Sequence, residues 1–589
     1  MSVYKSIIRC FLVAISFAFS VESADAASFI VEDGKANAEI VLPKEPNGFQ
    51  KLAADELREY IYKISGAELP IVMEITDEFP IKLYIGESRY TQKLGITAKG
   101  LTNDSYHVKS GADYIAFVGN DQVKTFKGPA GNRLKRDKAA AQRAQSEWDE
   151  MVGHSRWQVP AGGGAFKSYN PDLKLRFTDS RGSLMAVYDY LRSLGVRWYF
   201  PGEFGECLEK MNSIPLPEIN KTVKPDTARR LIAGAAYQFG KTSRSQALWI
   251  LRLGLGGESY TGPAGSWHSI NYILHRDETR ENRKDWYILK QGVRDTVSGG
   301  GKPCLMSKGL KDDFVAFAEK FFDVYGETRL SVSPTDGYVY LCECPLCAGK
   351  MKPELGRKGM LSDYVWTFVN EVAKALYEKY PNHKVFNLAY GAHFVPPASI
   401  EKFHPNVHVE IKSPRILYID PEMREMVLQQ RNEWLSKMTS QQPLSMGDNY
   451  TPLGRGPFPH FIPRIIAEDI KSLAGISYGE YIEENYLRPH EIKGENGDKP
   501  PLKLAVNHLN IYVTARLWWD ASQDIDAMLD EYCQKYYGPA AEAMSEFFKF
   551  TEANLLNIKI NKDVAIVDKT LELMDIAKKA VSKETIYGQ

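Results

Sequence analysis

The chain has 589 residues, of which 44% are hydrophobic and 25% charged, so it is long enough for two or three globular domains. Lysine plus arginine and aspartate plus glutamate number 74 each, which gives a formal net charge of zero. Because nucleic-acid binding calls for a basic surface, this balance and the lack of a basic stripe exclude nucleic acid as an expected partner.

The N-terminus has the pattern of a targeting signal. Lys5 and Arg9 precede the apolar run CFLVAISFAF at residues 10–19, and the small residues ADA follow at 24–26. The run is too short to span a bilayer. We therefore expect residues 1–26 to be a signal peptide. The mature protein would be periplasmic or extracellular, without stable membrane insertion.

Residues 27–215 are expected to form an N-terminal α+β domain. Apolar residues recur at helical spacing through FQKLAADELREYIYKISG (49–66), and Gly66 stands where a C-terminal helix cap belongs. Short β-type runs surround this helix, such as IKLYIGE (81–87) and YIAFVG (114–119).

The domain also contains a second amphipathic helix, in GSLMAVYDYLRSLG (182–195), and one stretch that breaks the pattern. Residues 121–165 are charged and rich in alanine and glycine. We interpret them as a solvated surface insertion. A lid over a binding cleft is the alternative, favoured by Trp148 and Trp157 alone.

Residues 216–520 alternate strand and helix patterns, which predicts parallel βα units and favours a (β/α)8 TIM-type barrel over an open sheet. Strand patterns include RLSVSPTDG (329–337), KVFNLAYG (384–391) and VHVEIKSP (407–414). Residues 521–589 are expected to form a C-terminal helical region. The fold class is therefore α/β, with the α+β domain before the barrel.

Export changes the expectation for the cysteines. Without Cys10, six remain: Cys207, Cys304, Cys342, Cys344, Cys347 and Cys533. An even number in an oxidising compartment favours disulfides. The C-x-C-x-x-C spacing, with Cys304 as a fourth ligand, could instead hold a structural zinc ion. We prefer disulfides and expect no cofactor.

Several stretches carry a resemblance to a known family. They are LAADELREYIYKISG (52–66), GSLMAVYDYLRSLGVRWYFPGE (182–203), DGYVYLCECPLC (336–347), LNIYVTARLWWD (509–520) and YYGPAAEAM (536–544). Together they resemble the bacterial family labelled domain of unknown function 4838. The first two also resemble the N-terminal module of family 67 α-glucuronidases and family 20 β-hexosaminidases. The resemblance implies an α+β domain on a (β/α)8 barrel that hydrolyses glycosidic bonds.

The sequence departs from family 20 at one position. Those enzymes carry an adjacent Asp-Glu pair after the fourth barrel strand, whereas Asp336 is followed by Gly337 here. Substrate-assisted hexosaminidase chemistry is therefore not expected.

Carboxylates at strand ends are the candidate catalytic groups, because barrel enzymes place these groups at the carboxyl ends of strands. Glycoside hydrolysis needs two carboxyl groups, one protonated and one ionised. We prefer Asp336 with Glu480, and Asp448 and Glu410 stand in similar positions. A helix cap or a solvated loop group is the plainer role for each.

Other polar and aromatic residues beyond strand patterns are candidate sugar contacts. They are Trp267, His268, Tyr390, His393, Asn449, Tyr450, Arg455 and Tyr478. Arg455 would favour an acidic sugar, because a guanidinium can bind a carboxylate through two hydrogen bonds.

The leading interpretation is an exported glycoside hydrolase acting on a complex polysaccharide or oligosaccharide that contains uronic acid or amino sugar. A non-catalytic carbohydrate-binding protein on the same fold is the alternative. A metal-dependent hydrolase ranks last, because a zinc ion held by four thiolates has no open position for water. The oligomeric state is left open.

Overall fold

The computed structural model describes most of the chain. The described residues are 28–123, 128–129, 138–160, 169–177, 179–232, 242–257, 268–297, 301–450, 460–483, 502–558 and 563–582. The expected signal peptide (1–26), Trp267 and Arg455 lie outside the described residues. Among the helices that are described, none combines the length and the apolar character needed to cross a bilayer.

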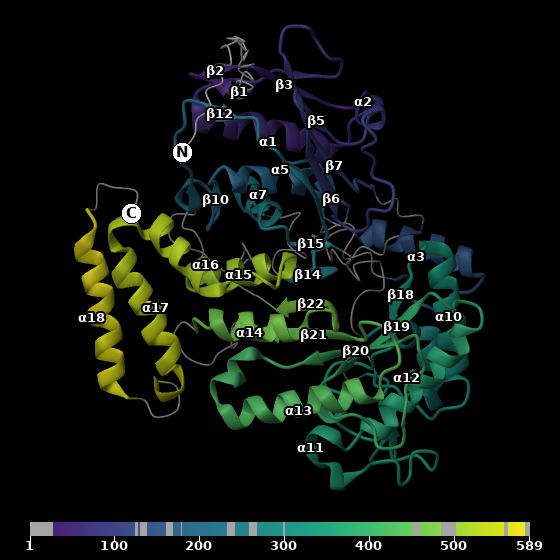
Figure 1. Cartoon of the computed structure of the whole chain (residues 1–589). Helices are drawn as coiled ribbons and strands as arrows, with labels where there is room; N and C mark the ends of the chain where they lie inside the picture. The colour runs from purple at the N-terminus through teal and green to yellow at the C-terminus, as the bar shows by residue number, and fades with distance from the viewer. Residues whose placement is uncertain are drawn as a thin grey trace, which may run out of the picture.

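A six-stranded mixed sheet organises the N-terminal part of the chain, at the top of Figure 1. Its strands, in spatial order, are β13 (Asn220–Val223), β6 (Tyr106–Ser110), β7 (Tyr114–Gly119), β5 (Ile81–Ile85), β3 (Ala38–Val41) and β4 (Ile71–Val72). Helices α1 (Gly48–Ser65) and α5 (Gly182–Ser193) pack against it. The predicted helix over 49–66 is thus confirmed. Asn47 caps its start, and Gly66 ends it in the left-handed conformation with φ 79°.

Several short elements complete this part. They are β1 (Phe29–Glu32), β2 (Lys35–Ala36), α2 (Arg89–Lys93), β8 (Tyr169–Asn170), β9 (Leu175–Arg176), β10 (Arg197–Trp198), β11 (Glu206–Cys207) and β12 (Ile214–Pro215).

The insertion near 121–165 is not simply a solvated surface segment. Its helix α3 (Lys138–Val152) buries Trp148, which stacks on Tyr325 with ring centroids 5.8 Å apart. Trp157 is also buried, and its indole nitrogen donates to Asp313 at 2.7 Å. Both partners belong to α10 (Leu310–Tyr325), so these tryptophans anchor the insertion to the second half of the chain.

A seven-stranded sheet forms the centre of that second half (Figure 1). Its order is β15 (Gly256–Gly257), β14 (Arg229–Ile232), β22 (Ser477–Glu483), β21 (Leu444–Asn449), β20 (Val407–Lys412), β19 (Lys384–Ala389) and β18 (Arg329–Ser331). The six strands from β14 to β18 in this order run parallel, and β15 is antiparallel to β14.

This order confirms the predicted α/β class. The strands β18 to β22 follow one another in space as in sequence, and β22 then pairs with β14, the first strand of the set. A barrel has this cyclic order. The described residues hold six parallel strands of the expected eight, and among them β18 and β14 are not paired.

Helices separate the strands and cover the sheet. The longer ones are α7 (Arg244–Arg252), α10, α12 (Ser362–Tyr377), α13 (Pro421–Lys437), α14 (Pro463–Leu473) and α15 (Leu502–Trp519). Shorter elements are α8 (Asn271–Leu274), α9 (Asp277–Asn282), β16 (Leu289–Lys290), β17 (Val293–Arg294), α11 (Gly356–Gly359) and the 3-10 turn η7 (Arg415–Ile419).

The expected C-terminal helices are present as α16 (Ile525–Tyr532), α17 (Ala541–Leu556) and α18 (Val564–Ala580). They share one continuous hydrophobic core with the N-terminal sheet and with residues of β14 and β22. Tyr199, for example, lies edge-on to Tyr512 and Tyr532, with ring centroids 4.9 and 5.0 Å away.

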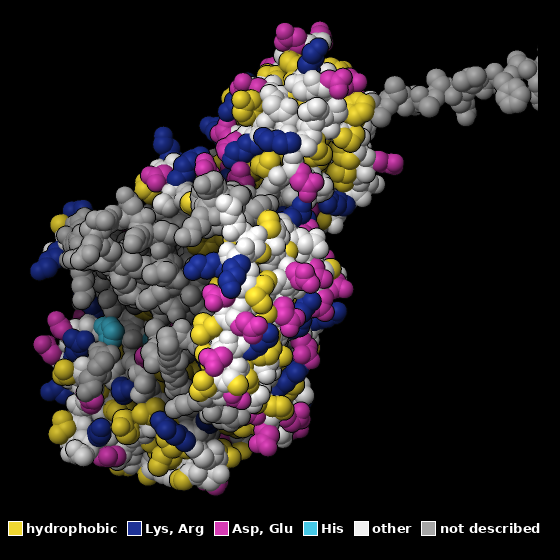
Figure 2. Space-filling model, turned by 90° about the vertical axis from the view of Figure 1, so that its left-hand side faces the viewer, with side chains coloured by type: hydrophobic (Ala, Val, Ile, Leu, Met, Phe, Trp, Pro, Cys, Tyr) yellow, Lys and Arg dark blue, Asp and Glu magenta, His cyan; other side chains and the backbone are white. Residues whose placement is uncertain are grey.

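On the face shown in Figure 2, acidic and basic side chains are interspersed, without an extended area of one sign. This distribution is in keeping with the zero net charge of the sequence.

Candidate functional site

The two faces of the central sheet hold different sets of charged residues. Side chains alternate along a strand, and residues in register on parallel neighbours point the same way. Glu480 is in register with Met446, and Asp448 with Ile482. Glu480 and Asp448 both lie beside Arg415, which also binds Asp469 on helix α14. Glu480 and Asp448 therefore point toward the helices, whereas Glu483 points to the opposite, inner face.

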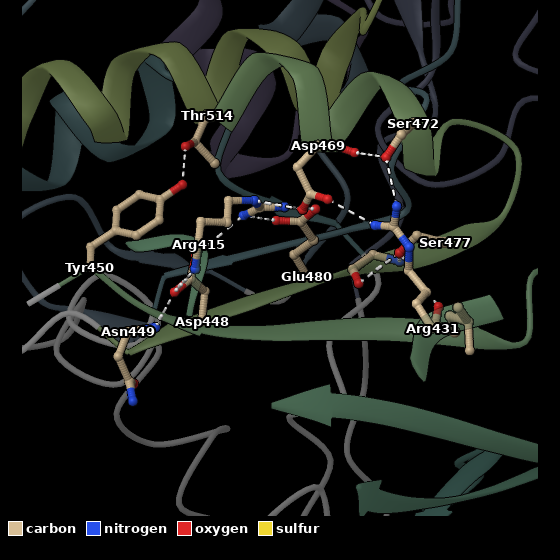
Figure 3. Close-up of polar contacts among 12 residues, drawn as sticks. Arg415, Arg431, Asp448, Asn449, Tyr450, Asp469, Ser472, Ser477, Glu480 and Thr514 are labelled. Carbon is tan, nitrogen blue, oxygen red and sulfur yellow. Dashed lines mark hydrogen bonds and ion pairs between the residues drawn. The ribbon is translucent and has the colours of Figure 1, made fainter. Parts of the chain in front are cut away.

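Glu480 is part of a buried ion cluster between the sheet and helices α13 and α14 (Figure 3). Arg415 donates to both of its carboxylate oxygens, at 2.7 and 2.9 Å, and its Nε donates to Asp469 at 2.8 Å. Arg431 donates to the other oxygen of Asp469 at 2.8 Å. The cluster thus joins strand β22, the turn η7 and both helices.

The expectation that Glu480 ends its strand and enters a loop is wrong. Strand β22 continues to Glu483, and Glu480 is only 2% exposed. With both oxygens bound by Arg415, it is an ion-pair partner on the helix-facing side of the sheet. The predicted pairing of Asp336 with Glu480 is therefore not supported by the geometry.

Asp448 belongs to the same cluster. It lies 3.5 Å from Arg415 Nη1, and its Oδ1 accepts from the backbone nitrogens of Arg415 and Asn449 at 3.3 and 2.6 Å. Burial raises the pKa of this carboxyl to about 6, because charge is poorly solvated there. Arg415 and Arg431 thus face three carboxyl groups, those of Glu480, Asp469 and Asp448. With Asp448 protonated, two positive charges would meet two negative charges.

The inner face has its own polar network near the carboxyl ends of β20 to β22. Arg229 donates to Glu410 at 2.6 Å, and both side chains are 1% exposed. Lys412 lies 3.4 Å from Glu410 and 3.9 Å from Glu483. Asn449, with its amide turned so that the nitrogen donates, reaches Glu483 at 2.9 Å. Glu410 is therefore committed to a cation, while the Glu483 side chain remains 39% exposed.

Asp336 lies in the exposed turn that follows β18, where the sequence placed it. It accepts hydrogen bonds from the hydroxyl of Tyr390 and, at 2.8 Å, from the backbone nitrogen of Gly337. Lys302 Nζ donates to the carbonyls of Asp336 and Gly337 at 3.2 and 2.5 Å. The hydrogen bond from Tyr390 lowers the pKa of Asp336, so this carboxyl is ionised over a wider range than usual.

Tyr390 is the hydrogen-bond donor to Asp336. It follows strand β19, and burial raises its pKa to about 12, with a further electrostatic contribution from Asp336 and from Glu483. Asp336 follows strand β18 and Glu483 ends strand β22, so both lie near the carboxyl edge of the parallel sheet.

The two predicted histidines differ in their surroundings. His268 has φ 77°, a backbone conformation that is uncommon outside glycine, and its Nδ1 lies 2.5 Å from the carbonyl of Pro334, two residues before Asp336. His393 is buried, and desolvation lowers its pKa to about 3, so it stays neutral. His268 therefore lies beside the Asp336 turn, and His393 packs edge-on against Tyr390, with ring centroids 5.7 Å apart.

Two predicted contacts lie elsewhere. Tyr450 is buried, and its hydroxyl contacts that of Thr514 on helix α15. Tyr478 packs under the Arg329 guanidinium, 3.6 Å from its ring centroid, at the amino end of β18. Neither reaches the exposed carboxylates. Sequence reasoning gave no role to Lys302, Lys412 or Arg229, because a charge in a strand or loop is no signal by itself.

The cysteine cluster lies beside the Asp336 turn. The four sulfurs of Cys304, Cys342, Cys344 and Cys347 are buried and all lie within 4.8 Å of one another. All the cysteines that the structure describes are free thiols. The expected disulfides are therefore absent from these residues, and the four-sulfur alternative has the geometry of a metal-binding group.

A separate cavity of about 370 Å³ lies between α5 and the helices α15 and α16. Arg192, Arg516 and Glu531 are among the residues that line it, and no residue of the central sheet does. It is therefore not part of the strand-end site.

Residues 200–549, more than half of the chain, match the family described as Domain of unknown function (DUF4838). The chain belongs to this family. The match includes every strand of the central sheet, and it confirms the resemblance noted in the sequence. A comparison with curated proteins found no match.

Three solved structures are similar to this DUF4838 protein. One is a family GH115 4-O-methyl-α-glucuronidase with specificity for decorated arabinogalactans: 12% identity, TM-score 0.48, covering 95% of this chain and 70% of that one. Another is a GH138 enzyme targeting pectin rhamnogalacturonan II. Its sequence identity is 9% and its TM-score 0.34, and the match covers 88% of this chain and 55% of that one. The third is the GH20 β-N-acetylhexosaminidase from Streptomyces coelicolor A3(2). Its sequence identity is 10% and its TM-score 0.35, and the match covers 89% of this chain and 93% of that one. These values are too low to assign an activity to this chain.

Proposed function

We propose that this protein is an exported glycoside hydrolase that cleaves a complex polysaccharide or oligosaccharide containing an acidic or amino sugar. One observation carries the proposal. Asp336 follows strand β18 and Glu483 ends strand β22, so both stand near the carboxyl edge of a parallel sheet, and Tyr390, which follows β19, binds Asp336.

The other strand carboxylates are occupied, which supports this choice of pair. Glu410 is bound by Arg229, and Glu480 is bound by Arg415. Asp448 is buried beneath the helices. Among the described residues of β18 to β22 and of the turn after β18, Asp336 is exposed and the Glu483 side chain is 39% exposed, so a substrate can reach both.

The two carboxyl groups would divide the work of glycoside hydrolysis. Asp336 is held ionised by Tyr390 and Gly337, which suits the nucleophile or the base. Glu483 would then protonate the leaving oxygen. Lys302 binds the carbonyl of Asp336, and its positive charge there would favour a substrate carboxylate.

The test is a screen of acidic and amino-sugar glycans with the purified mature protein, scored by new reducing ends. The wild type should release sugar, and Asp336→Asn should lower turnover by about 10²–10⁴-fold, the usual contribution of such a group. Asp312→Asn, an exposed position at the start of α10, is the matched control and should keep full activity.

A non-catalytic carbohydrate-binding protein is the second candidate. It is favoured by the commitment of Glu410, Asp448 and Glu480 to ion pairs, which leaves few free carboxylates. Measurable glycan binding with no release of sugar by the wild type would support it and refute the hydrolase.

A further inference from the structure

Four cysteines from two separate segments meet beside the candidate site. Cys304 follows the loop that carries Lys302, and Cys342, Cys344 and Cys347 lie in the turn after Asp336. Cys304 Sγ is 3.5 Å from Cys347 Sγ and 3.7 Å from Cys344 Sγ. All four side chains are at most 2% exposed.

These distances fit one ion better than disulfide bonds. A zinc–sulfur bond is about 2.3 Å, so four sulfurs at the corners of a tetrahedron around zinc are about 3.8 Å apart. A disulfide joins two sulfurs at about 2.05 Å. Two separate disulfides do not require that all four sulfurs lie around one point. The convergence of four sulfurs on one point is the feature that a metal explains.

The surroundings suit thiolates. The backbone nitrogen of Leu289 donates to Cys342 Sγ at 3.1 Å, and Arg294 Nη1 lies 3.6 Å from the same sulfur. The hydroxyl of Tyr364 is 3.3 Å from Cys347 Sγ. Hydrogen bonds and positive charge around the ligands are usual at metal sites, where they orient the ligands and offset their charge.

We propose that Cys304, Cys342, Cys344 and Cys347 bind one structural zinc ion. Four thiolates fill a tetrahedral zinc ion and leave no position for water, so the site holds the fold and takes no part in chemistry. The metal would tie the segment that carries Lys302 and Cys304 to the turn after Asp336.

The position of the cluster gives the ion a second consequence, which rests on the proposed function. Lys302 is two residues from Cys304 and binds the carbonyls of Asp336 and Gly337, while the hydroxyl of Tyr338 donates to Pro303 at 2.5 Å. Fixing Cys304 would therefore fix both Lys302 and the Asp336 turn. Loss of zinc should raise KM for a glycan as well as lower stability.

The metal site is tested without any substrate. The mature full-length protein is purified without chelator, and its metal content is measured by mass spectrometry. We expect one zinc per chain, released in step with modification of four thiols by a mercurial reagent. After exchange, cobalt should give the thiolate charge-transfer and visible bands of a tetrahedral sulfur site. Chelation should lower the melting temperature.

Variants locate the ligands. Cys344→Ser and Cys347→Ser should each lose the stoichiometric metal, whereas Cys533→Ser, which removes a buried cysteine in the C-terminal helices, should retain it. If the serine variants do not fold, thiol counting and the cobalt spectrum of the wild type still decide. Disulfides among the four cysteines, or a chain that binds no zinc after reduction, would overturn the proposal. Its failure would leave the hydrolase proposal standing, because sugar release is measured independently.

Discussion

Arg415 binds Glu480 through both terminal guanidinium nitrogens, with Nη1 2.9 Å from Oε2 and Nη2 2.7 Å from Oε1. The same arginine holds Asp469 through Nε. It is the central cation of a buried cluster, and this position makes it a determinant of stability.

We expect Arg415→Met to be strongly destabilising. Removing one partner of a buried ion pair leaves an unpaired buried charge, which costs about 3–5 kcal/mol. Here two carboxylates, Glu480 and Asp469, would lose a partner. The free energy of unfolding, measured with denaturant, checks this. Arg424→Met, at an exposed ion pair with Glu468, is the control and should cost less than about 1 kcal/mol.

Asp448 gives a prediction about pH. Its folded pKa of about 6 is above its usual value of 3.8, so between these values the folded state binds more protons than the unfolded state. Stability therefore falls as pH rises from 4 to 6, by about 3 kcal/mol for this group. Asp448→Asn cannot ionise and keeps an acceptor oxygen. Its stability relative to wild type should rise over this window in denaturation series, and parallel curves would refute the assignment.

The proposed roles of Asp336 and Glu483 differ in their dependence on the leaving group. An activated aryl leaving group departs with little protonation of its oxygen, so it needs little help from a general acid. The Glu483→Gln variant should therefore retain most of the wild-type turnover on an aryl glycoside. On a natural glycan the same variant should lose about 10²–10⁴-fold. Asp336→Asn should be slow on both. Equal losses for the two variants on the aryl glycoside would reject Glu483 as the acid.

Tyr390→Phe tests the hydrogen bond that holds Asp336 ionised. Without the phenol the pKa of Asp336 rises, because a donor to the charged form is lost. Activity that needs the ionised carboxylate should therefore appear at a higher pH, and the acidic limb of the profile of kcat/KM should move upward. Tyr340→Phe, an exposed tyrosine in the same loop region, is the control. An unmoved limb in Tyr390→Phe would exclude this role.

Local patterns in the sequence predicted much of the fold. The capped helix α1 and the alternation of strands and helices through β18 to β22 follow from periodicity and cap residues, which act over a few positions. The placement of Asp336 in a turn after a strand follows from the same local signals.

The direction of Glu480 could not be predicted in this way. Strand β22 is buried on both faces, so no polar alternation marks its inner side, and its pairing with β21 is irregular between Ser477 and Gly479. A shift of one residue exchanges the faces of every side chain beyond it. The partner Arg415 is 65 residues away in the chain, and such contacts leave no local pattern.

The cysteines show a different limit. Six thiols and an expected signal peptide favoured disulfides on grounds of compartment, whereas the decisive fact is that Cys304 meets the C-x-C-x-x-C turn from 40 residues away. The composition gives the number of thiols. Which thiols lie close together depends on the fold.

The pairing of β14 with β22 sets an order for biosynthesis. Arg229 is in register with Gly479, a residue made some 250 positions later, and an added Cβ at Gly479 would lie 2.4 Å from that of Arg229. At about 5–20 residues per second the ribosome needs at least some ten seconds to cover that distance. During this interval β14 has one edge without its final partner. Such an edge can pair with other chains, so a nascent chain would benefit from a chaperone until β22 emerges.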